Sequence, residues 1–94
     1  MTTTEKVEFM LDAVRMLNTA LKAVVGESAD ARIYVYTPVE EDERAANLAL
    51  ALCLRYVGGT EKEFGGTRWV VQSGVTVFTS EPLPLEHYPY DIPF

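Results

Sequence analysis

The sequence has one cysteine, one histidine and no cluster of catalytic side chains, and each scarcity removes a class of function. Cys53 has no partner for an internal disulfide and lies within an apolar run, so we expect a small buried hydrophobe in a reducing compartment. Nucleophilic catalysis needs a base near a Ser, Thr or Cys, and the lone His87 falls in a proline-rich segment. We therefore expect no enzymatic activity, no metal site and no cofactor.

Basic residues are also few, because 8 Lys and Arg stand against 14 Asp and Glu, for a net charge of −6. Phosphate binding is driven by Lys and Arg, so this balance argues against a general nucleic-acid coat. No apolar run reaches the roughly 20 residues of a membrane span, and the N-terminus lacks the basic start of a signal peptide. We expect a cytoplasmic protein without a membrane partner.

The stretch from Thr37 to Gly59 surrounds the most apolar run with helix start and stop signals. Thr37 and Glu40 match a capping box, and Pro38 occupies the first helical position. The polar strip of this helix comprises Glu40, Arg44, Asn47, Ala51 and Arg55. The strip is narrow, so we predict a central helix whose remaining circumference is covered by other elements.

Another helix is predicted near the N-terminus, from a capping box of Thr2 and Glu5 to Gly26. Its main apolar face comprises Val7, Met10, Leu11, Val14, Leu17, Leu21 and Val24. A second apolar strip beside it comprises Phe9, Ala13, Met16, Ala20 and Ala23. In one interpretation the helix packs on both the sheet and the central helix, or the tail covers it; in the other, the helix forms the seam of a homodimer.

Strict alternation from Arg32 to Tyr36 predicts a strand, with Ile33 and Val35 toward the core. Residues 68–72 predict a second strand parallel to the first, and residues 58–67 before it are interpreted as a loop. Ser73-Gly74 then predicts a hairpin into a third strand, residues 75–79. The predicted fold of residues 1–80 is α+β: an αβαββ two-layer sandwich, with both helices on one face of a three-stranded mixed sheet.

The other face of this sheet is expected to be open. It would present Tyr34 and Tyr36, with Trp69 or Phe78 depending on the strand phase. Aromatic rings stack on unpaired bases and cations contact phosphates. The candidate single-stranded DNA-binding residues are Arg32, Tyr34, Tyr36, Arg68 and Trp69, with Lys62 as a further phosphate contact. The alternative use of these rings is a dimer interface or a bed for the tail.

Residues 81–94, EPLPLEHYPYDIPF, form a proline-rich tail that we predict to be extended. The tail ends in Asp91-Ile92-Pro93-Phe94, which resembles the C-terminal tip of bacterial single-stranded DNA-binding proteins. Those tips characteristically finish in acidic residues followed by Ile-Pro-Phe. The resemblance covers only this tip, and Tyr90 stands where a further acid is common.

This resemblance implies docking on host proteins that bind such tips. The Phe94 ring would enter a hydrophobic pocket while its α-carboxylate pairs with an Arg or Lys of the partner. Ile92 and Pro93 would add apolar contact, Asp91 and Glu86 would form the acidic flank, and Tyr90 completes the partner-binding set.

Two hypotheses follow from the residues and the resemblance. The first is a non-enzymatic protein of DNA replication, recombination or repair, encoded by a phage or mobile element, which binds single-stranded DNA and recruits host proteins through its tip. The second is a mimic of the tip that acts as a decoy, inhibitor or adaptor of a host enzyme without binding DNA. A polyproline-groove ligand at Pro82-Leu83-Pro84 is a weaker third.

Overall fold

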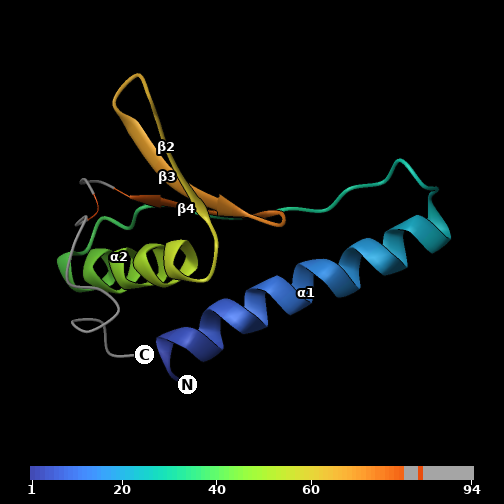
Figure 1. Ribbon diagram of the computed structural model, residues 1–94, viewed down its shortest axis with the longest axis horizontal. Coiled ribbons are helices and arrows are strands. Elements are labelled where there is room, and N and C mark those ends of the chain that lie inside the picture. The colour runs from blue at the N-terminus through green and yellow to red at the C-terminus, as the bar shows by residue number, and fades with distance from the viewer. Residues whose placement is uncertain (80–82, 84–94) are drawn as a thin grey trace.

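The computed structural model describes residues 1–79 and Leu83. In chain order the elements are α1 (Thr3–Val24), β1 (Ile33–Val35), α2 (Glu41–Tyr56), β2 (Thr60–Phe64), β3 (Thr67–Gln72) and β4 (Val75–Thr79). Both helices lie on one side of a four-stranded mixed sheet (Figure 1). The predicted α+β class is therefore confirmed. The predicted extended tail lies outside the described residues, apart from Leu83, which is 5% exposed and packs in the core.

The strands follow the order β1-β4-β3-β2 across the sheet. β1 runs parallel to β4, and β3 pairs antiparallel with both β4 and β2. The predicted hairpin between β3 and β4 is confirmed, since Ser73 and Gly74 have φ of 47° and 86° and Gln72 pairs with Val75. Two successive residues with positive φ are typical of the tight turn that matches strand twist.

β2 is a strand that the sequence interpretation assigned to a loop, and the prediction of three strands was wrong. Residues 60–64 pair antiparallel with β3, and Gly65 and Gly66 form the turn with φ of 59° and 85°. β2 is an edge strand rich in charged side chains, which discourages pairing with other chains. Such a strand lacks the apolar alternation that would have revealed it.

The additional strand also reverses the direction of β3. The crossover from β1 through α2 leads into β2, which runs parallel to β1, and the hairpin then turns β3 antiparallel to β1. The prediction that residues 68–72 run parallel to residues 32–36 was therefore wrong. It took β3 to be the first strand after α2, whereas β2 is that strand.

The predicted capping box at the start of α1 is present. The Glu5 backbone N–H donates to Thr2 Oγ1 at 3.1 Å, and the Thr2 backbone N–H donates to Glu5 Oε1 at 3.0 Å. Val7 and Val14 on the main apolar face are 0% and 1% exposed. The helix is thus specified by local hydrogen bonds at its start and by core contacts along one face.

α1 packs on both α2 and β4 of the sheet, as one interpretation predicted, but these elements leave its second apolar strip exposed. We call Phe9, Ala13, Met16, Ala20 and Ala23 the α1 strip. Phe9 is 64% exposed and Met16 is 71% exposed. The other possibility, that the tail covers the α1 strip, involves residues outside the described part of the chain.

α2 begins at Glu41 rather than at Pro38, and the predicted capping box of Thr37 and Glu40 was wrong. Glu40 is the N-cap and makes no side-chain cap hydrogen bond, while its carbonyl accepts from the Arg44 N–H at 2.9 Å. Residues 36–40 instead connect the end of β1 to the helix layer. The first turn is nevertheless acidic, which the helix dipole favours.

The strip predicted to be the polar side of α2 packs against the sheet at Asn47 and Ala51, which are 4% and 0% exposed. Asn47 Nδ2 donates to the backbone carbonyl of Phe78 in β4. Arg55 Nη1 pairs with Glu61 Oε1 of β2 at 3.1 Å. The prediction that this strip faces solvent was wrong because the sheet supplies hydrogen-bond and ion-pair partners for Asn47 and Arg55. A polar group that has such a partner can be buried.

Replacing Asn47 with alanine should lower the free energy of unfolding by about 1–3 kcal/mol, because it removes a hydrogen bond to a buried carbonyl. Urea unfolding followed by circular dichroism measures this change. Arg44→Ala, at an exposed position on the same helix, is the matched control. Equal urea midpoints for the two variants would contradict the buried placement of Asn47.

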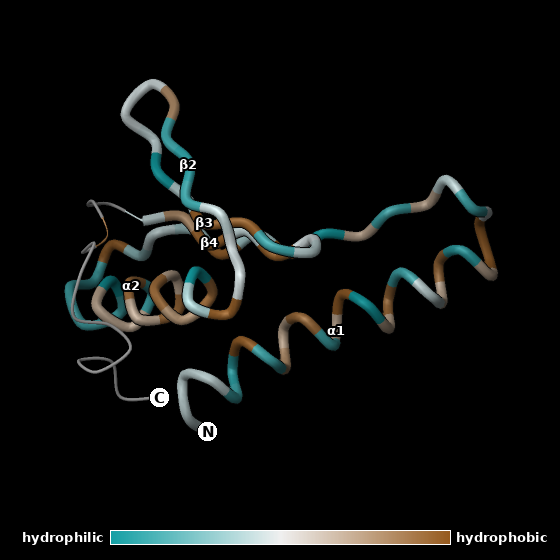
Figure 2. The backbone as a smooth tube through the Cα atoms, viewed as in Figure 1, coloured by the Kyte–Doolittle hydropathy of each residue, from teal (hydrophilic) through white to brown (hydrophobic). Residues whose placement is uncertain are grey.

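The core lies between the sheet and the helix layer (Figure 2). Its fully buried residues include Val7, Ala51, Cys53, Leu54, Val70, Val75 and Val77, each 0% exposed. The prediction that Cys53 is a buried hydrophobe is confirmed, and burial raises the pKa of its thiol. Among the residues that the structure describes, no helix is both long and apolar enough to cross a membrane.

Candidate nucleic-acid interface

The sheet has one face against the helices and one face without any described element over it. Side chains alternate along each strand, so Val70 and Val77 point into the core while Trp69 and Phe78 point outward. Tyr34 lies on this same outward side and lines a common hollow with them. The prediction that the tyrosines face away from Ile33 and Val35 agrees with their exposure, 48% for Tyr34 and 69% for Tyr36.

We define the aromatic face as Tyr34, Tyr36, Trp69 and Phe78. Phe78 is its centre: its ring centroid lies 5.2 Å from that of Tyr36, 6.4 Å from Tyr34 and 6.1 Å from Trp69. The Tyr36 and Phe78 rings are almost parallel, at 3°. These separations are typical of packed aromatic pairs, so the cluster holds its own rings in place. The four side chains form one packed aromatic surface, in which Tyr36 is the most exposed ring at 69%.

The sequence left open whether Trp69 or Phe78 joins the tyrosines, and the structure brings both together. Trp69 of β3 and Phe78 of β4 are directly opposite each other in the strand pairing, so their side chains lie on the same face of the sheet. Trp69 is in turn opposite Lys62 of β2. A row of side chains from Phe78 through Trp69 to Lys62 thus crosses three neighbouring strands.

A hollow of about 440 Å³ lies on this side of the sheet. Its lining comprises Arg32, Tyr34, Lys62, Trp69, Val71, Thr76 and Phe78. The volume falls within the roughly 300–1,000 Å³ of small-ligand sites. The lining combines aromatic rings with two cations and contains no carboxylate. Such a lining suits a ligand that has a planar ring and a negatively charged group attached to it.

The two cations stand toward opposite edges of the sheet. Arg32 directly precedes the edge strand β1, and Lys62 lies in the other edge strand, β2. Arg32 Nε donates to Asp30 Oδ2 at 2.8 Å, and this hydrogen bond raises the pKa of Arg32. No ion pair of Lys62 with another described residue is found. A cation therefore lies on each side of the aromatic face, and the one near β1, Arg32, is paired with Asp30.

Arg68 does not lie on the aromatic face, so the structure does not bring this predicted DNA-binding residue together with the others. It neighbours Trp69 along β3 and therefore points to the opposite face. Its Nη1 pairs with Glu63 Oε2 at 2.7 Å. Lys62 is the cation that β2 places on the aromatic face, and the two glycine pairs bracketing residues 60–64 were the sequence signal for that strand.

The acids of β2 are turned away from the aromatic face. Glu61 pairs with Arg55 and Glu63 pairs with Arg68, both on the helix side of the sheet. Because the strand alternates, Lys62 between them projects outward. The acidic excess of the whole chain is therefore not a measure of the charge on this face.

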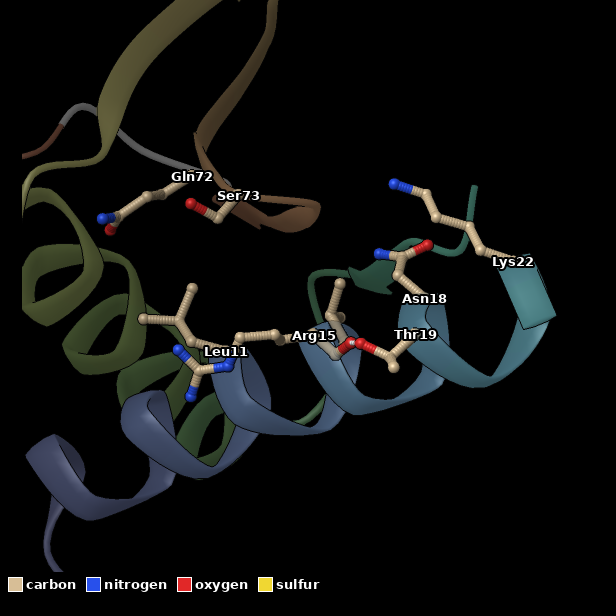
Figure 3. Close-up of a pocket in the computed structure, with 8 residues that line it drawn as sticks. Leu11, Arg15, Asn18, Thr19, Lys22, Gln72 and Ser73 are labelled. Atoms are coloured by element: carbon tan, nitrogen blue, oxygen red, sulfur yellow. Dashed lines mark hydrogen bonds between the residues drawn. The ribbon is translucent and has the colours of Figure 1, made fainter. Parts of the chain in front are cut away.

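A second hollow, of about 500 Å³, lies between α1 and the β3–β4 turn (Figure 3). Asn18 exchanges hydrogen bonds with the backbone of Ala31, at 3.2 Å and 2.5 Å, and thereby ties α1 to the segment before β1. Arg15 pairs with Asp12, and Thr19 Oγ1 donates to the Arg15 carbonyl at 3.0 Å. These polar groups serve the local structure, so we place the candidate interface on the aromatic face.

The partner-binding residues predicted from the tip, Tyr90, Asp91, Ile92, Pro93 and Phe94, lie outside the described residues. His87 and Glu86 lie outside them as well. Among the described residues, no group of three or more His, Cys, Asp or Glu side chains could hold a metal ion.

Comparison with known proteins returns no match to any family model, to any curated protein or to any solved structure. Function must therefore be argued from the aromatic face and from the sequence of the tip.

Proposed function

We propose that this chain is a non-enzymatic, cytoplasmic protein of DNA metabolism, encoded by a phage or mobile element. It binds single-stranded DNA through the aromatic face and docks on host replication, recombination or repair proteins through its C-terminal tip. The observation that carries the DNA-binding part is the grouping of four aromatic side chains with Arg32 and Lys62 on the sheet face over which no described element lies.

The chemistry of single strands fits this surface. Unpaired bases expose their ring faces, and each base stacked on an aromatic side chain contributes about 1–3 kcal/mol by alanine substitution. Tyr36 and Tyr34 offer the most exposed rings. Arg32 and Lys62 would contact phosphates on either side of the stacked bases. With only two flanking cations, binding should be weak and lost at moderate salt.

The DNA-binding part is tested by titrating Trp69 fluorescence and, separately, the anisotropy of a labelled oligothymidine. Because Trp69 is the only tryptophan, its signal reports on this face alone. We expect saturable quenching at low salt that weakens as salt is added. A flat trace in both measurements at low salt would contradict DNA binding.

The double variant Tyr34→Ala with Tyr36→Ala should weaken oligothymidine binding by at least about 30-fold, since two stacking rings together contribute about 2 kcal/mol or more. The matched control is Tyr56→Ala, a tyrosine of similar exposure, 52% against 48% for Tyr34, on α2. A shared urea midpoint with wild type shows that the fold is intact. If the folded double variant binds oligothymidine as tightly as wild type, the aromatic face is not the DNA-binding site.

The cations have their own test within the same assay. Lys62→Ala should weaken binding and reduce its salt dependence by roughly the contribution of one phosphate contact. Lys6→Ala, an exposed lysine on α1, is the control for a change of net charge alone. An equal effect of the two variants would indicate only a general effect of charge.

The second candidate, a tip mimic that occupies a host enzyme without binding DNA, is favoured by the net charge of −6. The two candidates differ in one result. A flat titration together with tip-dependent capture of a host protein supports the mimic, whereas quenching together with capture supports the first proposal.

A further inference from the structure

The α1 strip leaves a large apolar area without a described partner. Beyond Phe9 and Met16, the neighbouring Leu17 is 49% exposed and Val24 is 83% exposed. Figure 1 shows the C-terminal half of α1 extending beyond α2 and the body of the sheet. Exposed apolar strips of this length mark interaction surfaces, since monomers seldom keep them.

The charges of α1 are separated along its length. Its first half carries the acids Glu5, Glu8 and Asp12 and the base Lys6. Its second half carries Arg15, which pairs with Asp12 of the same chain, and Lys22, and has no acid. Two copies of this helix placed side by side in the same direction would set acids against acids. Two antiparallel copies would set the acidic half of each against the basic half of the other, with opposed helix dipoles.

We propose that the α1 strip is the contact surface of an antiparallel homodimer, in which a second copy of this chain covers the strip. The two-fold axis passes near Met16. Such an isologous contact uses the same patch on both copies, so the patch must complement itself. The charge separation of α1 supplies that complementarity in the antiparallel arrangement only.

The sizes of the side chains along the α1 strip are compatible with a two-fold axis near Met16. Phe9 and Ala23 each lie seven positions from Met16, so the large ring of one copy faces a small alanine of the other. Ala13 and Ala20 lie three and four positions from Met16 and allow the helices to approach closely. Along the helix axis, Glu8 of each copy comes within about one turn of Lys22 of its partner.

The first test measures mass in solution by light scattering over a range of concentrations. We expect twice the 10.5 kDa of one chain at high concentration, and 10.5 kDa for Met16→Glu, which buries a charge in the contact. Met16 is 71% exposed in the single chain, so this variant should keep its helix content and urea midpoint. Thr67→Glu makes the same change at an exposed position of β3, away from the α1 strip, and this control should remain dimeric.

The second test distinguishes antiparallel from parallel packing by disulfide cross-linking. Phe9→Cys mixed with Ala23→Cys should cross-link efficiently, whereas Phe9→Cys alone should not. Buried Cys53 should leave the wild type uncross-linked. Efficient cross-linking of Phe9→Cys to itself would overturn the antiparallel arrangement.

Three results would overturn the dimer itself. They are a wild-type protein that is monomeric at every concentration, a Met16→Glu variant that stays dimeric, and a monomeric wild type that dimerises once residues 85–94 are removed. The last would show that the tail, rather than a second copy, covers the α1 strip. None of these measurements uses DNA or a host protein, so failure of the dimer is separate from failure of the proposed function.

Discussion

Replacing Leu54 with alanine is expected to lower the free energy of unfolding by about 2–5 kcal/mol, because a fully buried leucine leaves a cavity that its neighbours fill only in part. Leu54 is 0% exposed and is the largest of the fully buried side chains. It lies on α2 and belongs to the buried core between the helix layer and the sheet. A loss of this size is a large fraction of the roughly 5–15 kcal/mol that stabilises a small domain.

The exposure of the leucines sets an order for the measured effects. Leu52→Ala should also be costly, since Leu52 is 8% exposed, whereas Leu50 is only partly buried and should cost less. Val24→Ala, at an 83% exposed position, is the control with little expected change. Urea midpoints that do not separate Leu54→Ala from Val24→Ala would contradict the packing of α2 on the sheet.

The second large effect concerns the C-terminal tip and depends on its resemblance to the tips of single-stranded DNA-binding proteins. Adding one residue after Phe94 should abolish capture of a purified host protein with a known pocket for such tips. The extension keeps every side chain but moves the α-carboxylate away from its basic partner. Loss of one such charge-assisted contact costs about 2–5 kcal/mol, which is enough to erase a micromolar interaction.

Two companion experiments identify the tip as the binding element. A peptide of residues 86–94 should compete with the full chain, and competition should weaken with salt because the acidic flank contributes. The extended variant should retain the urea midpoint of wild type. If the extended chain is still captured, or the peptide fails to compete, the Asp91-Ile92-Pro93-Phe94 ending is a coincidence.

The proposed DNA site and the tip can fail separately. Loss of oligothymidine binding in the tyrosine double variant should leave capture by the tip intact, and extension after Phe94 should leave oligothymidine binding intact. A chain in which both hold would carry single-stranded DNA on its sheet and host proteins on its tail.

Patterns that depend on neighbouring residues could be predicted from the sequence. The capping box of Thr2 and Glu5, the Ser73-Gly74 hairpin and the limits of β4 are all local, and all are confirmed. The outward direction of Tyr34 follows from strand alternation alone. These features are set by hydrogen bonds and backbone dihedral angles within a few residues, so the local sequence is sufficient to predict them.

Patterns that depend on distant partners were decided by the tertiary structure. Residues 60–64 become a strand only because β3 offers them a pairing edge, and that pairing places Lys62 beside Trp69 on the aromatic face. Asn47 is polar in the sequence yet buried, because Phe78, 31 positions away, supplies a carbonyl for its amide. The cost of burying a polar group or of exposing an apolar one depends on what lies opposite, and only the folded chain determines that.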